Sequence, residues 1–147
     1  MVCNYHASSK KRALEELSDL LARNVDEMDA SEIFEGLTER ERLGSTGLGR
    51  GVAIPHARLP GREQAMGAFI KLHNGVDFDA IDQKPADLLF ALLVPDHFTD
   101  EHLELLAGLA RMFDDDALCQ KLRQSGDKAQ LFDVLMNSQE MDKLFST

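Results

Sequence analysis

Seven consecutive apolar residues, Leu88 to Val94, restrict the possible fold of this chain most strongly. The run lies between Asp87 and Pro95 and is far shorter than the roughly 20 residues that cross a bilayer as a helix. A short apolar run without polar alternation is typical of a strand that is covered on both faces. Because helical patterns precede and follow it, we expect an α/β fold, a single-domain sandwich in which α-helices flank a mixed β-sheet.

Apolar spacing and capping residues predict five helices around this strand. Asp29 and Asp127 each stand three residues before Glu32 or Gln130, which is the spacing of a capping box. The predicted helices cover about residues 10–24, 29–42, a stretch that begins after residue 99, 117–123 and 127–137. The third of these is expected to bury one apolar stripe, made of Leu103, Leu106, Ala107, Ala110 and Phe113.

Two further strands are predicted beside the central one, Val52–Pro55 and Met66–Leu72. Between the second of them and the central strand, residues 77–85 are mostly polar. We expect this connection to be anchored to the core by Phe78 and Ile81.

Composition and charge exclude several classes of protein. The 147 residues are expected to form one domain over residues 1–147, with residues 1–9 as a weakly specified lead-in. A net charge of −10 argues against nucleic acid as the main partner, because phosphate contacts need a basic surface. The N-terminus lacks the apolar stretch of a signal peptide, and Cys3 and Cys119 lie far apart. We therefore expect a cytoplasmic protein with reduced thiols and no membrane insertion.

His56 is the strongest candidate for a reactive side chain. It ends the predicted strand Val52–Pro55, and the proline before it restricts the backbone, so the imidazole is stiffly mounted. A neutral imidazole is nucleophilic near pH 7 without an activating base, since its ordinary pKa is about 6.5. The same pattern also fits a histidine that only ends a strand and bonds to backbone.

A glycine-rich run, residues 44–51, precedes His56 and can form neither regular helix nor regular strand. It lacks the Lys-Ser/Thr pair of a P-loop. One interpretation is a flexible turn. The other is a phosphate cradle, because backbone N–H groups and hydroxyls can donate hydrogen bonds to phosphate oxygens. The candidate phosphate-binding residues are Gly44, Ser45, Thr46, Gly47 and Gly49.

Two more side chains could assist His56. Arg40 closes the second predicted helix and could neutralise a phosphorylated imidazole, although the same position suits a solvated surface charge. His102 lies in the first turn of the helix after Thr99 and could donate to phosphate, or serve only as a capping or surface residue. His97 and His102 are not four residues apart, so we expect no metal site.

The segment RERLGSTGLGRGVAIPHARL, residues 40–59, resembles the active-site segment of the fructose/mannitol class of enzyme IIA proteins. These proteins belong to the bacterial phosphoenolpyruvate phosphotransferase system. Residues 78–95, FDAIDQKPADLLFALLVP, are more similar to its nitrogen-regulatory branch, EIIA-Ntr. The similarity extends over nearly the whole chain from residue 9 onward.

This resemblance implies a phosphocarrier and assigns roles to the candidate residues. His56 would be the phosphoryl acceptor, through Nε2, and Arg40 and His102 would be the conserved arginine and the second histidine of the active site. The donor would be the histidine phosphocarrier NPr or an HPr-like protein. Family members bind targets such as potassium-transport and sensor-kinase proteins according to phosphorylation state, and no cofactor is implied.

Two alternatives stay open at this stage. The chain could be a sugar-specific EIIA component that passes phosphate to a fructose- or mannitol-type EIIB. It could also be a binding module that acts without phosphorylation.

Overall fold

The structure is a computed structural model that describes residues 2–5, 7–23, 29–59, 66–95 and 100–137. For residues 2–5, 59, 95 and 100–102 it describes the backbone alone. Within these ranges the chain forms six strands and five helices. The strands are β1 Val2–Tyr5, β2 Gly47–Gly49, β3 Val52–Ala53, β4 His56–Leu59, β5 Met66–Val76 and β6 Ala86–Pro95. The helices are α1 Lys10–Arg23, α2 Ala30–Leu43, α3 Asp100–Phe113, α4 Asp116–Gln124 and α5 Lys128–Met136.

The strands form one mixed sheet in the order β1-β5-β6-β3-β2, with β4 also paired to β6. β1 runs parallel to β5, and β3 and β4 run parallel to β6, whereas the β5–β6 and β2–β3 pairs are antiparallel. β6 contains the apolar run Leu88 to Val94, and all seven of its side chains are buried. The predicted central strand is therefore confirmed.

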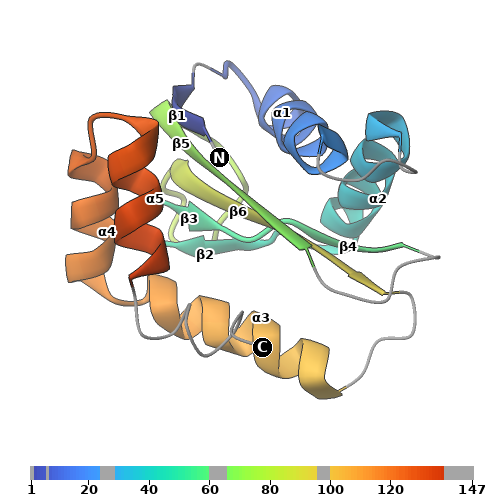
Figure 1. The fold of residues 1–147 in the computed structure, drawn as a ribbon. Coiled ribbons are helices and arrows are strands. Elements are labelled where there is room, and N and C mark those ends of the chain that lie inside the picture. Colours follow the sequence, from blue (N-terminus) through green and yellow to red (C-terminus); the bar gives the residue numbers. More distant parts are fainter. Residues whose placement is uncertain (1, 6, 24–28, 60–65, 96–99, 138–147) are drawn as a thin grey trace.

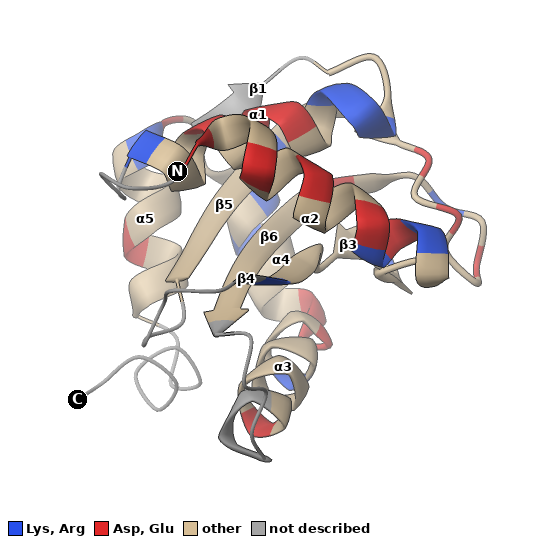
Figure 2. Ribbon diagram, turned by 90° about the vertical axis from the view of Figure 1, so that its right-hand side faces the viewer, with Lys and Arg blue, Asp and Glu red and all other residues tan. Residues whose placement is uncertain are grey.

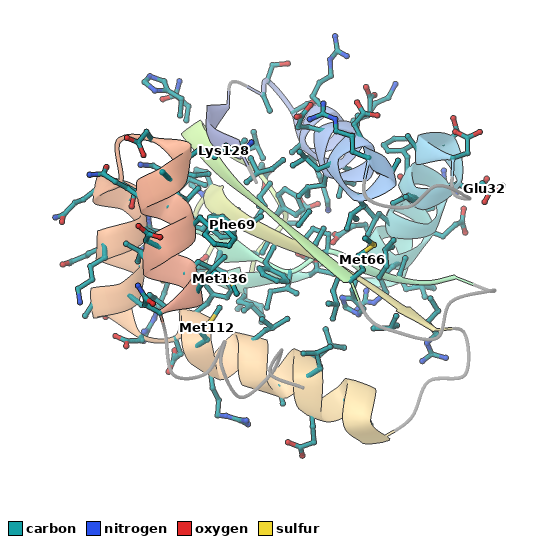
Figure 3. The ribbon with its side chains drawn as sticks, viewed as in Figure 1. Glu32, Met66, Phe69, Met112, Lys128 and Met136 are labelled. Carbon is teal, nitrogen blue, oxygen red and sulfur yellow. The ribbon has the colours of Figure 1, made fainter. Side chains whose placement is uncertain are left out.

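Helices cover both faces of this sheet (Figure 1). α1 and α2 pack on one face, where Leu17 and Leu37 meet Ile70 and Leu89 in a first core cluster. α3, α4 and α5 pack on the other face, where Phe69 and Met112 belong to a second cluster (Figure 3). The predicted α/β sandwich with a mixed sheet is confirmed.

Aspartates cap three of the helices. The carboxylate of Asp29 accepts from the Ser31 amide, and that of Asp127 accepts from the Gln130 amide at 2.9 Å. Asp115 caps α4 in the same way. A carboxylate at this position satisfies backbone N–H groups that have no partner inside the helix, which explains why the predicted helix starts lie within one or two residues of the observed ones.

The buried face of α3 differs from the prediction. Leu103 is 54% exposed and Ala107 is also exposed, whereas Leu105, Leu109 and Met112 are buried. Of the predicted stripe, Phe113 is buried and Leu106 and Ala110 are only partly covered. The helix is apolar around most of its circumference, so two stripes at helical spacing compete and only the packing of the sheet decides between them.

The N-terminal lead-in and the connection before β6 also differ from the prediction. Residues 2–5 of the expected lead-in form β1, an edge strand paired to β5, because pairing with a neighbouring strand is a tertiary effect that four residues do not encode locally. Phe78 is fully buried, as expected for an anchor. Ile81 is 98% exposed, so its expected role as a second anchor is wrong.

The eight residues around His56, from Val52 to Leu59, run alongside β6. β3 pairs Val52 with Leu88, and β4 pairs His56 with Leu92, in the same parallel register. The ladder is interrupted only at Ile54 and Pro55, where the Pro55 carbonyl still accepts from the Leu92 amide at 2.9 Å. His56 therefore begins a strand, whereas the sequence pattern predicts that it ends one.

Candidate functional site

The glycine-rich run forms a β-hairpin beside His56. β2 and β3 pair antiparallel, and the turn between them contains Arg50 and Gly51, with φ of 58° and 83°. Positive φ at both central positions is typical of the type I′ turn, which matches the twist of a two-residue hairpin. The expectation that residues 44–51 contain no strand is therefore wrong, since three of the run's residues, 47–49, are β2.

Contacts from α4 and from two connecting segments fix this turn. The Arg50 amide donates to the Asp82 carboxylate at 2.7 Å, which lowers the pKa of Asp82. The Arg50 carbonyl accepts from Nη2 of Arg123 on α4 at 2.8 Å. The Arg50 side chain reaches Asp114 and Asp116 at 3.3 Å. Arg50 therefore fastens the hairpin to the C-terminal helices.

The imidazole of His56 is held from both sides. Nδ1 lies 3.0 Å from the carbonyl oxygen of Ile54, and Nε2 lies 3.2 Å from Nε of Arg40. A carbonyl oxygen can only accept and a guanidinium can only donate. The hydrogen-bond network therefore assigns the proton to Nδ1 and the lone pair to Nε2.

Arg40 is oriented by a second bond. Its Nη1 donates to the carbonyl of Gly44 at 2.8 Å, so the guanidinium lies between the end of α2 and the imidazole. The Gly44 amide in turn donates to the Glu41 carbonyl as the helix cap. The structure thus brings Arg40, Gly44 and His56 together, as the sequence analysis expected for the arginine and the histidine.

Burial lowers the pKa of His56 below its ordinary value of 6.5. Desolvation is the largest cause, and the positive charges of Arg40 and Arg58 add to it. The Ile54 hydrogen bond and the negative charge of Glu41 oppose it. The imidazole is therefore neutral near pH 7, the state in which Nε2 can act as a nucleophile.

The hydroxyl-bearing residues of the run bond within the protein. Both Thr46 donors, its amide and its hydroxyl, bind the carboxylate of Glu41. Ser45 donates its hydroxyl to the Phe78 carbonyl and accepts from the Gly47 amide. Both hydroxyls and the amides of Thr46 and Gly47 therefore already have partners, while phosphate binding by the run stays a prediction.

Gly49 and His102 complete the predicted set. Gly49 is buried in β2 with φ of 91°, and a Cβ there would lie 3.1 Å from the Asp82 carboxylate. His102 lies on α3, and its side chain is outside the described part of the structure. Among the described residues, no three His, Cys, Asp or Glu side chains could hold a metal ion.

Glu41 is not among the residues predicted from the sequence. Its side chain is only 5% exposed, and it contacts Lys10 on α1 as well as Thr46. Glu41 follows Arg40 directly, but several other acids lie close by in the sequence of α2. Its place next to the arginine is the only local signal, and that signal does not distinguish it from the exposed Glu39 two residues earlier.

This arrangement can accept an electrophilic group. A neutral imidazole presents the Nε2 lone pair, and the neighbouring guanidinium can bind negative oxygens that arrive with the group. Comparison with known proteins identifies the family. Residues 1–138 match the family described as "Phosphoenolpyruvate-dependent sugar phosphotransferase system, EIIA 2". The chain belongs to this EIIA 2 family. It is thus a phosphotransferase-system component, as the resemblance implied.

Relatives of this EIIA 2 chain include regulatory and sugar-specific proteins. The "Nitrogen regulatory protein" of Pseudomonas aeruginosa is 47% identical over 136 residues, which cover 92% of this chain and 88% of the relative. The crystal structure of "Nitrogen Regulatory Protein IIA-Ntr" from Neisseria meningitidis matches with a TM-score of 0.84 and 45% identity, covering 91% of each chain. The "PTS system fructose-specific EIIA component" of Haloferax volcanii is 39% identical over 130 residues, covering 87% of this chain and 83% of the relative.

The similarity to nitrogen regulatory proteins confirms the expected resemblance of this EIIA 2 chain to EIIA-Ntr. Among the helices of the described residues, none is long and apolar enough to cross a membrane.

Proposed function

We propose that this EIIA 2 protein accepts a phosphoryl group on Nε2 of His56 from an NPr- or HPr-like histidine phosphocarrier. The observation that supports this best is the two-sided contact of the imidazole, with Nδ1 on the Ile54 carbonyl and Nε2 facing Arg40. This contact leaves the lone pair on the nitrogen that would attack. Phosphoenolpyruvate is the ultimate phosphoryl source of such a system, so we further propose a cytoplasmic location.

The proposed step needs no net proton transfer. The Nε2 lone pair forms a bond to phosphorus while the donor's nitrogen–phosphorus bond breaks, and its electrons return to the donor imidazole. Because Nδ1 of His56 already carries a proton, the phosphorylated ring needs no further one. Arg40 would move its Nε–H from the lone pair to a phosphoryl oxygen, which stabilises the transferring charge.

We also propose that phosphorylation regulates binding of target proteins, of the potassium-transport or sensor-kinase class. A phosphoryl group would add about −1.5 to −2 charges at the site, by analogy with other phosphorylated residues. Leu43, the last residue of α2, and Leu48 in β2 are 85% and 48% exposed. Exposed leucines beside a site of changing charge suit a protein partner that is sensitive to phosphorylation.

The test of acceptance is phosphoryl transfer followed by intact mass. Purified protein is incubated with phosphoenolpyruvate, enzyme I and NPr, and the acid-labile mass increase is measured. We expect no increase for His56→Ala, and slower transfer for Arg40→Ala and His102→Ala. Labelling that persists in His56→Ala would show that another residue is the acceptor.

A second candidate function is transfer to a sugar-specific EIIB, favoured by the fructose-specific name of the Haloferax relative. Adding a fructose- or mannitol-type EIIB domain to the phosphorylated protein separates the two functions. Rapid loss of label to EIIB would support sugar transport, and a stable label would support regulation. Equal target binding by the wild type and His56→Ala, with or without phosphoenolpyruvate, would instead support a phosphorylation-independent binding module.

A further inference from the structure

We propose that Glu41 is a positioning residue for the imidazole of His56, acting through Thr46 and Ile54. Its importance for phosphoryl transfer rests on the proposed function, but its effect on the ring can be measured without any transfer. Two adjacent residues at the end of α2 act on opposite sides of the ring. Arg40 contacts the Nε2 side of the ring directly, and Glu41 reaches the Nδ1 side through the hairpin.

The first part of the connection is the pairing of Glu41 with Thr46. The Thr46 amide lies 3.3 Å from Oε1 and 3.4 Å from Oε2 of Glu41, and the Thr46 hydroxyl donates to Oε1. The Glu41 side chain and the whole of Thr46 are nearly excluded from solvent, at 5% and 6% exposure. Charge-assisted bonds in such an environment are stronger than neutral ones, so this pairing fixes where β2 begins.

The second part joins Thr46 to the ring. The Thr46 carbonyl accepts from the Ile54 amide at 3.1 Å, and the Ile54 carbonyl lies 3.0 Å from Nδ1 of His56. Because the amide, hydroxyl and carbonyl of Thr46 belong to one residue, a displacement of Thr46 from Glu41 would also displace its bond to Ile54. Three successive contacts, joined through the backbone of Thr46 and of Ile54, thus connect the Glu41 carboxylate with Nδ1.

Lys10 explains how a buried carboxylate is tolerated in this place. Its Nζ lies 2.7 Å from Oε2 of Glu41 and 5.0 Å from the centre of the Phe78 ring. A buried charge without a partner is costly, so Lys10 compensates Glu41 and leaves Oε1 to Thr46. The negative charge of Glu41 also raises the pKa of His56, in opposition to Arg40 and Arg58.

The experiment measures the ring nitrogens of His56 by ¹⁵N NMR and the kinetics of phosphoryl transfer from NPr. Glu41→Gln keeps the shape but loses the charge, and Thr46→Val loses the hydroxyl. For both variants we expect a smaller fraction of the Nδ1–H tautomer. We also expect kcat to fall by up to about tenfold with little change in KM, since positioning acts on the reacting geometry. Thr46→Ser is the conservative rescue and should recover most of both readouts relative to Thr46→Val.

Glu39→Gln provides the matched control. Glu39 lies on the same helix, pairs with Arg42 and has a side chain that is 61% exposed. We expect its removal to leave the tautomer fraction and the transfer kinetics as in the wild type.

The outcomes separate the two proposals. If Glu41→Gln and Thr46→Val lower only the unfolding temperature and leave the tautomer fraction and kcat unchanged, Glu41 is merely structural and the inference is wrong. If the variants shift the tautomer fraction but the wild type never accepts phosphate, the positioning role stands and the proposed function fails. Should Glu41→Gln not fold, the Thr46→Val and Thr46→Ser pair still decides, because equal tautomer fractions in the two would overturn the inference.

Discussion

Arg123 on α4 binds Asp87 on β6 through two parallel hydrogen bonds, from Nε to Oδ2 and from Nη2 to Oδ1, each 3.0 Å long. The hydrogen bond to Asp87 raises the pKa of Arg123. The same Nη2 donates to the Arg50 carbonyl, so this ion pair fits directly against the turn of the β2–β3 hairpin. The hairpin that precedes His56 is therefore fixed by Glu41 at one end and by Arg123 and Asp87 at the other.

Gly51→Ala should destabilise the protein by about 1–3 kcal/mol. A Cβ at residue 51 would lie 2.5 Å from Nη2 of Arg123 and 2.9 Å from Oδ1 of Asp87, and the φ of 83° is strained for alanine. Urea unfolding measures the loss. The control is Gly126→Ala, where the nearest atom to a new Cβ is 3.5 Å away and the backbone is not left-handed, and its free energy of unfolding should change little.

The buried face of α3 can be tested with two leucines on one helix. Leu109 is fully buried in the second core cluster, whereas Leu103 is 54% exposed. Leu109→Ala should lower the free energy of unfolding by about 2–5 kcal/mol, because it leaves a cavity in a packed core. Leu103→Ala should cost less than about 1 kcal/mol. Equal losses would contradict the helix orientation described above.

Arg40→Lys should slow phosphoryl transfer to His56 by about tenfold to a hundredfold under the proposed function. Lysine keeps the positive charge, but it cannot donate from one planar group to both the imidazole and the Gly44 carbonyl. Single-turnover kinetics from phosphorylated NPr measure the rate. Arg42→Lys, on an exposed neighbour that pairs with Glu39, should transfer at the wild-type rate.

The lowered pKa of His56 predicts a specific pH dependence of stability. In the unfolded chain His56 binds a proton near its ordinary pKa of 6.5, whereas burial delays protonation in the folded protein. The stabilisation that the neutral ring contributes is therefore fully present above pH 6.5. It decreases as the pH falls from 6.5 toward the lower pKa of the folded protein. Urea unfolding of the wild type and of His56→Gln between about pH 7.5 and pH 5 measures the difference, which should shrink on acidification. A difference that grows instead would show that the folded pKa is raised.

Local signals in the sequence are sufficient to predict the central strand and most helix boundaries. The apolar run in β6 and the capping aspartates Asp29 and Asp127 each act through their immediate neighbours, so their effect can be predicted without the rest of the fold. Proline and glycine also mark the segment around His56 and Arg40, and the two side chains do lie in contact, while their roles in phosphoryl transfer stay predictions.

The remaining features depend on contacts between distant segments. The sheet beneath α3 decides which face of that helix is buried. The hairpin turn is held by Asp82, Asp87 and Arg123, whose hydrogen-bond partners Arg50 and Gly51 are 32 to 73 residues away in the sequence. Glu41 was missed because its contact with Lys10 joins α1 to α2, and its contact with Thr46 depends on the path of the chain after α2. Figure 2 shows how many other acidic residues lie along these two helices, so type alone could not single it out.

The unchanged register of β3 and β4 along β6 has a consequence for how this segment can evolve. Val52, Ala53 and the residues from His56 to Leu59 each face a fixed partner on β6, and the alternation of the pleat decides which face of the sheet each side chain joins. One inserted or deleted residue would turn Ala57 to the opposite face of the sheet and carry the imidazole away from the guanidinium. Amino-acid replacements can therefore accumulate between the hairpin and the histidine, but the number of residues that separates them cannot change.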